Sequence, residues 1–249
     1  MRKNKKLTYL FLLFAVSFLL IPAPAVFAEE TDHLTPDEYK KVLQGGVLYD
    51  KWYAETGLDL NASHPTYPAA GKKNGASTWR CKECHGWDYR GNNGAYTKGS
   101  HFTGIKGIRD YVNKRPSVIR EVLENDIHGY DIKMPKEAYE ALSFFVAYGQ
   151  IDMNKYIDVS TKKVRGSVIN GEKIYTSACI KCHGANGKKI NFKTPEKPQY
   201  LGTVANKNPW ETLHKIRFGQ PSTKMVSLLF LDIKSQVDVL SYCQMLPAH

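Results

Sequence analysis

The chain has 249 residues, with 42% hydrophobic and 24% charged residues and a formal net charge of +11. Removing residues 1–28 takes away four of the 35 basic residues and none of the 24 acidic ones, which lowers the net charge to +7. No later run of Lys or Arg exceeds two residues, so the sequence predicts no nucleic-acid partner and leaves a solvated basic surface or steering toward an acidic redox partner.

The N-terminus has the pattern of a secretory signal peptide. Basic residues precede an apolar run over 7–21, which ends in the small-residue stretch "PAPAVFA". The apolar run is shorter than the roughly 20 residues that a spanning helix needs. We therefore expect cleavage after Ala28 and export to the periplasm or an equivalent compartment, with membrane contact only through an uncleaved signal segment.

The first predicted helix contains a pattern that recurs 126 residues later. The matching residues are Gly45, Leu48 and Tyr49 in the first copy and Gly171, Ile174 and Tyr175 in the second. The stretch near 50–78 has no counterpart in the second copy and is rich in turn formers, so it is predicted to be a loop insertion. It would either cover a site, provide a docking surface or be a tolerated surface loop.

Two pentapeptides carry the chemistry. "CKECH" places Cys81, Cys84 and His85 in the spacing C-x-x-C-H, and "CIKCH" repeats it 98 residues later with Cys179, Cys182 and His183. In this signature two cysteines form thioethers with a porphyrin and the next residue offers its imidazole to the iron. The sequence therefore predicts two covalently bound haem c groups, with His85 and His183 as axial ligands.

Other uses of the cysteines fit the sequence less well. A four-ligand zinc site does not require a histidine beside each cysteine pair, and the two pairs lie 98 residues apart. A thioredoxin-like dithiol would need a βαβ context, and no strand pattern flanks either motif. Cys243 is predicted to be a buried thiol in the last helix rather than a reactive cysteine.

Further helices are predicted after each motif, beginning near Pro116 and Pro209, where the missing proline N–H costs nothing. The last helices of the two copies superpose under a shift of 98 residues, with Leu142-Ser143-Phe144 matching Leu240-Ser241-Tyr242. No segment of useful length has the alternation of polar and apolar residues that is typical of a β-strand. We therefore predict an all-α protein with two tandem domains, at 29–155 and 156–249.

The second axial ligand of each iron decides whether a haem carries electrons or reacts with a ligand. Met134 and Met225 each follow a motif histidine and precede the last helix of a copy, so both are predicted axial ligands. Met153 and Met245 are predicted to be packing residues. In the first copy His128 or His101 remains an alternative to Met134, whereas His214 is predicted to be a surface or edge histidine.

These motifs together resemble class I cytochromes c, and specifically members with two tandem monohaem domains. The resemblance is strongest over "NGEKIYTSACIKCHGANG", the later methionine and "QVDVLSYCQMLP". It implies an all-α fold, His/Met coordination and single-electron transfer between extracytoplasmic redox proteins. It also implies a proline carbonyl that holds the proximal imidazole. Pro195 or Pro198 could do this for His183, but no proline lies between His85 and Pro116.

The preferred function is therefore a dihaem electron carrier rather than an enzyme. The alternatives are a dihaem peroxidase, a thiosulfate dehydrogenase-like oxidoreductase, or a cytochrome subunit of a larger respiratory complex. A peroxidase needs an openable axial position, which a methionine ligand in each copy argues against. Dihaem thiosulfate dehydrogenases use a cysteine ligand, and no cysteine lies between His85 and Cys179.

Overall fold

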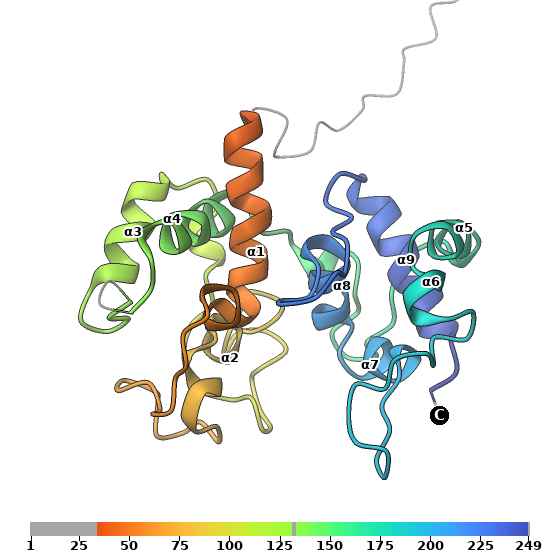
Figure 1. Cartoon of the computed structure of the whole chain (residues 1–249), viewed down its shortest axis with the longest axis horizontal. Coiled ribbons are helices and arrows are strands. Elements are labelled where there is room, and N and C mark those ends of the chain that lie inside the picture. Colours follow the sequence, from red (N-terminus) through yellow and green to blue (C-terminus); the bar gives the residue numbers. More distant parts are fainter. Residues whose placement is uncertain (1–33, 131–132, 249) are drawn as a thin grey trace, which may run out of the picture.

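The computed structural model describes residues 34–130 and 133–248, so the predicted signal peptide lies outside the described residues. Helices α1 to α4 form one half of the molecule and α5 to α9 form the other, side by side (Figure 1). The helices are α1 Pro36–Thr56, α2 Cys81–His85, α3 Pro116–Glu124, α4 Lys136–Phe144, α5 Val168–Ala178, α6 Ile180–His183, α7 Leu201–Lys207, α8 Pro209–Phe218 and α9 Ile233–Met245.

The fold is all-α, as predicted, because the described residues form isolated β-bridges but no strand. Short 3₁₀ helices occur at Gly75–Trp79, Arg109–Tyr111 and Met153–Lys155, and a π-helical turn at Phe145–Gly149 extends α4. Within the described part of the chain, no helix combines the length and apolar character that crossing a bilayer requires.

In the first half, α1 packs against α4 at a glycine. A Cβ on Gly45 would lie 2.1 Å from the carbonyl oxygen of Ala141, so the two backbones approach too closely for any side chain. Thr35 and Glu38 form a capping box at the start of α1. The helix continues to Thr56 with a break at Lys51, so the prediction of a loop from residue 50 is wrong for its first seven residues.

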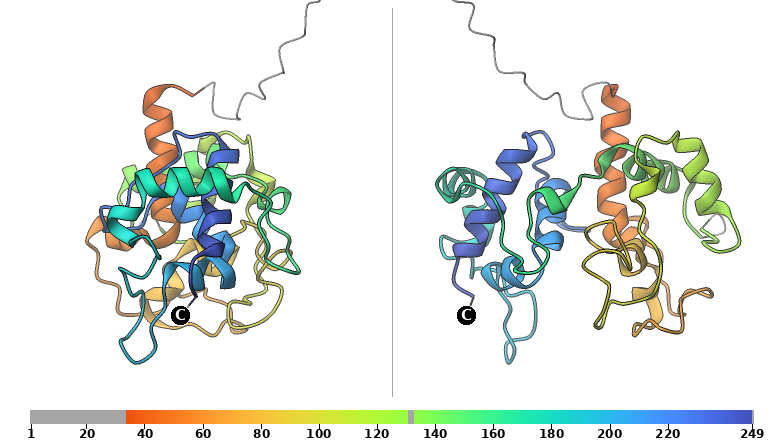
Figure 2. Two further views of the ribbon diagram at one scale, coloured as in Figure 1. Left: turned by 90° about the vertical axis from the view of Figure 1, so that its right-hand side faces the viewer. Right: turned by 180° about the vertical axis from the view of Figure 1, so that it is seen from behind.

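The second half repeats this packing. Helix α5 crosses α9 (Figure 2), and a Cβ on Gly171 would lie 1.9 Å from the carbonyl oxygen of Asp238 in α9. The glycines that the sequence aligned, Gly45 and Gly171, therefore have the same structural role. Helix α7 was not predicted. Helices α3 and α8 begin at Pro116 and Pro209 as expected.

The two halves contact each other through α1 and α8. The ring of Phe218 fills the space beside Gly46, where an added Cβ would lie 2.2 Å from it. His214 is fully buried in this contact and donates its Nε2–H to the carbonyl of Gly46 at 2.8 Å. The prediction that His214 is a surface or edge histidine is therefore wrong, because the second half covers it with the first.

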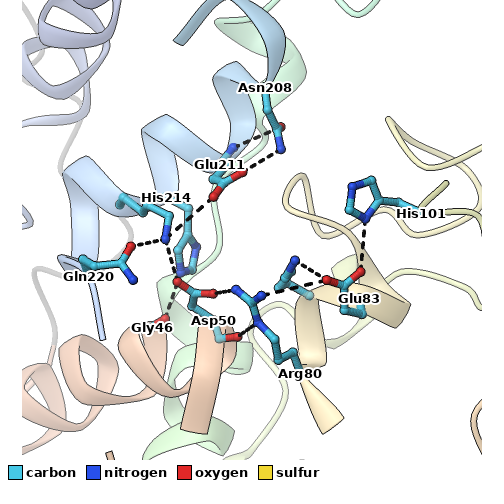
Figure 3. Close-up of polar contacts among 11 residues, drawn as sticks. Gly46, Asp50, Arg80, Glu83, His101, Asn208, Glu211, His214 and Gln220 are labelled. Atoms are coloured by element: carbon cyan, nitrogen blue, oxygen red, sulfur yellow. Dashed lines mark hydrogen bonds and ion pairs between the residues drawn. The ribbon is translucent and has the colours of Figure 1, made fainter. Parts of the chain in front are cut away.

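A buried carboxylate connects three segments of the interface (Figure 3). Asp50 in α1 is fully buried and forms ion pairs with Arg80, just before α2, and with Lys215 in α8, whose Nζ lies 2.8 Å from its Oδ2. Burial raises the pKa of Asp50, but the two cations outweigh this and hold it at about 2. The two halves are thus joined by paired charges as well as by apolar contacts.

Candidate haem sites

Each C-x-x-C-H motif forms a short helix that a tyrosine holds from the preceding helix. Tyr49 of α1 donates its hydroxyl to the carbonyl of Gly86, just after His85, at 2.6 Å. Tyr175 of α5 makes the same bond to the carbonyl of Gly184, just after His183, at 2.7 Å. The helix preceding each motif therefore fixes the position of the motif histidine.

The backbone that follows each histidine is also repeated. Gly86 has φ 79° and ψ 158°, and Gly184 has φ 79° and ψ 161°, a conformation that favours glycine. The carbonyl of His85 accepts from the amide of Gly91 at 2.8 Å, and that of His183 accepts from the amide of Lys189 at 3.0 Å. Two motifs with different flanking sequences therefore have the same local geometry.

A cavity of about 540 Å³ adjoins the first motif, a volume in the range of small-molecule and cofactor sites. Cys81, Cys84 and His85 line it together with apolar residues of the first half. The apolar lining residues include Ile105, Ile108, Ile119, Val122, Leu123, Leu142 and Val146. Two thiols and an imidazole at the wall of an apolar cavity suit a porphyrin attached at its edge.

The imidazole of His85 is oriented by the chain that follows it. Its Nδ1 donates to the carbonyl of Lys106 at 2.8 Å, which leaves Nε2 with its lone pair for a metal. Lys106 thus supplies the carbonyl that no proline could supply in this half. Burial lowers the pKa of His85 to about 4, so the imidazole is neutral near pH 7, as a metal ligand must be.

The three candidates for the other axial position lie in different surroundings. His128 lines the cavity, and its ring lies nearly parallel to that of His85, with centroids 6.2 Å apart and planes 23° apart. Met134 is buried, but it is not among the described residues that line the cavity. His101 contacts Glu83 through Nδ1 at 3.1 Å and stacks on Tyr96, and it does not line the cavity either.

The second motif is more exposed. Cys182 is exposed, Cys179 and His183 are half-buried, and Met225 is half-buried in the segment between α8 and α9. The Nδ1 atom of His183 is buried and has no hydrogen-bond partner among the described residues. The carbonyls of Pro195 and Pro198 therefore do not hold this imidazole here, in contrast to the role suggested for one of them.

The thiols have properties that differ from those of a reactive dithiol. None of the five cysteines forms a disulfide. Burial raises the pKa of Cys81 to about 12 and that of Cys84 to about 11, whereas redox-active pairs have lowered values. The residues that the structure describes contain no cluster of three His, Cys, Asp or Glu side chains suited to holding a metal ion.

For the three remaining cysteine and methionine residues with a predicted role, two predictions are confirmed and one is wrong. Cys243 is buried in α9 and Met153 is fully buried, as predicted. Met245 is 68% exposed, so its prediction as a packing residue is wrong, because the last turn of α9 leaves it facing solvent.

Residues 168–227 match the model of the cytochrome c family, from the first residue of α5 through the second C-x-x-C-H motif to just beyond Met225. No curated protein matches the chain. The family match supports a class I cytochrome c domain in the second half. Such domains bind haem c covalently, transfer electrons and are typically extracytoplasmic.

Proposed function

We propose that the chain is a dihaem cytochrome c that transfers single electrons between extracytoplasmic redox proteins. The observation that carries this proposal is the repeated contact of Tyr49 with Gly86 and of Tyr175 with Gly184, because it places both motifs in the same setting. Only the second setting lies within the family match. The shared geometry supports extending the assignment to the first half, with a domain boundary near 155.

The residues of the chain fit two haem c groups. Cys81, Cys84 and His85 face an apolar cavity, and Tyr175 holds the second motif in the same way as Tyr49 holds the first. The proposed attachment residues in the second half are Cys179 and Cys182, and the proposed axial ligands there are His183 and Met225. A bound haem supplies a one-electron iron couple.

The protein contributes position, ligands and an apolar wall. The Tyr49 and Lys106 contacts fix His85 without involving its Nε2, and apolar side chains line much of the first site. A site with rigid ligands on both faces changes little on reduction, which favours electron transfer over ligand chemistry. The α1–α8 contact holds the two proposed sites in one molecule.

The test is the number of covalent haems on the full chain, produced in a cell that exports and matures cytochromes c. Denaturing mass spectrometry should give the polypeptide mass plus two haems. Replacing Cys81 and Cys84 by Ala should remove one haem, and replacing Cys179 and Cys182 should remove the other. A wild-type protein with one haem or none would overturn the proposal.

A further inference from the structure

The ring of His128 has the separation from His85 that two imidazoles on one metal ion require. An imidazole nitrogen binds a transition metal at about 2 Å, and the ring centroid lies roughly 1 Å behind it, so two rings on opposite faces of one ion have centroids about 6 Å apart. The centroids of His85 and His128 are 6.2 Å apart. Packed aromatic rings also occur at this separation, and what adds to it here is that both rings line the same cavity.

Both rings are held by their Nδ1 atoms. His85 donates from Nδ1 to the carbonyl of Lys106 at 2.8 Å, and Nδ1 of His128 lies 3.3 Å from Oδ1 of Asn125. The same Oδ1 atom accepts from the amide of His128 at 3.1 Å. Metal-bound histidines commonly have such a partner on the nitrogen that does not bind the metal. Nε2 of His85 is thereby left for the iron, and the ring of His128 also has a hydrogen bond to the backbone of Val122.

The insertion after α1 holds the turn that carries His128. His64 donates its Nε2–H to the carbonyl of His128 at 2.8 Å, and the hydroxyl of Thr66 donates to the carbonyl of Ile127 at 2.6 Å. With its Nε2 donating, His64 uses Nδ1 to accept from the amide of Thr66 at 3.3 Å. Both ring nitrogens of His64 are therefore engaged, so it positions His128 rather than competing with it.

We propose that His128, and not Met134, is the second axial ligand of the haem attached to Cys81 and Cys84, and that the insertion positions it. This inference rests on the proposed function, because it assigns a ligand to the first of the two haems. Between His183 and Met225 the second half has one histidine, His214, and that residue is buried in the contact between the halves. The first centre is thus bis-histidine and the second His/Met.

Two unlike centres have unlike reduction potentials. A methionine ligand raises the potential of a haem iron relative to a second imidazole. The first centre is therefore the lower-potential one, and an electron shared by the two haems resides mainly on the second. The second half lacks the insertion. The insertion is therefore what makes the reduction potentials of the two haems differ.

The test counts the methionine ligands of haem iron in the intact ferric protein. The weak near-infrared charge-transfer band of a methionine-bound ferric haem should have the intensity of one centre per molecule, and electron paramagnetic resonance should show a second, bis-imidazole centre. Met225→Leu should abolish the band, whereas Met134→Leu should leave it unchanged. Met245→Leu, at an exposed methionine, is the matched control. A band of two-centre intensity, halved by Met134→Leu, would overturn the inference.

A second variant tests the histidine directly. His128→Ala should retain the near-infrared band of the methionine-bound haem. After reduction the variant should bind one carbon monoxide per molecule, and added imidazole should block this binding. A variant that excludes carbon monoxide as the wild type does would contradict the proposal. If the variant does not fold, the intensity of the near-infrared band in the wild type still tests the ligand assignment. The haem count by mass tests the dihaem proposal separately from the ligand proposal. Two haems that both have a methionine ligand would reject only the assignment of His128.

Discussion

The hydroxyl of Tyr89 lies 2.8 Å from Nδ1 of His214, in a contact that joins residues 125 positions apart. Burial lowers the pKa of His214 to about 3 and keeps the ring neutral, so with Nε2 donating to the carbonyl of Gly46, Nδ1 accepts from the hydroxyl of Tyr89. Both nitrogens are satisfied without a charge. The main contact between the two halves therefore includes a histidine that folding keeps unprotonated.

We expect His214 to make the stability of the protein depend on pH. Burial lowers its pKa from 6.5 to about 3, so between these values the unfolded chain binds a proton that the folded chain does not. The free energy of unfolding should therefore fall as the pH decreases from about 6.5 toward 3, by up to about 1.4 kcal/mol per pH unit from this group.

Denaturant unfolding of the wild type and of His214→Leu at pH 7, 6, 5 and 4 measures this contribution. The variant loses two hydrogen bonds at every pH, so its absolute stability is lower throughout. The informative quantity is the slope of the free energy of unfolding against pH, which should be shallower in the variant than in the wild type. Parallel slopes would show that His214 is protonated in the folded protein.

The ion pairs of Asp50 should contribute strongly to stability. Asp50→Asn removes the buried carboxylate and leaves Arg80 and Lys215 only the longer ion pairs to Glu83 and Glu211. Breaking a buried ion pair costs about 3–5 kcal/mol. The exposed pair of Lys41 and Glu140 is the control, because Glu140→Gln should cost at most about 1 kcal/mol. Denaturant midpoints at pH 7 compare the two, and equal losses would contradict the importance of the buried site.

The repeated glycines should respond alike to substitution. Gly45→Ala and Gly171→Ala each introduce a Cβ within 2.1 Å of a backbone carbonyl oxygen on the facing helix. Overpacking of this kind costs about 1–3 kcal/mol. Lys173→Ala, at an exposed position of α5, should change stability by less than about 0.5 kcal/mol. Thermal unfolding in which only one glycine variant is destabilised would show that the two helix contacts are not equivalent.

The sequence predicted the parts of the fold that depend on local signals. The helix starts at Pro116 and Pro209 and the paired glycines Gly45 and Gly171 follow from neighbouring residues and from the repeat. Helix α7 was missed because its sequence, "LGTVANK", has no clear helical periodicity and no side-chain cap.

The errors at the sites arise from contacts between distant residues. The burial of His214 depends on Gly46 and Tyr89, which lie 168 and 125 positions away. The axial ligand of the first half, predicted as Met134 with His128 or His101 as alternatives, stays a prediction, because the choice depends on where distant segments place these residues. A histidine that turns toward a cavity has the same local sequence as one that faces solvent.

If His128 is the axial ligand that we propose, the hydrogen bonds from the insertion should control how readily it dissociates from the iron. His64→Leu and Thr66→Val together remove the donors to the carbonyls of His128 and Ile127. Each such bond contributes about 1 kcal/mol, so the double variant should bind carbon monoxide at the first reduced haem up to about thirtyfold faster. Thr161→Val is the matched control, because it removes an exposed hydroxyl that donates to Oδ1 of Asp158 in the segment between the two halves. Flash photolysis or stopped-flow mixing measures these rates. Equal rates in the double variant and in the control would show that the insertion does not hold this ligand.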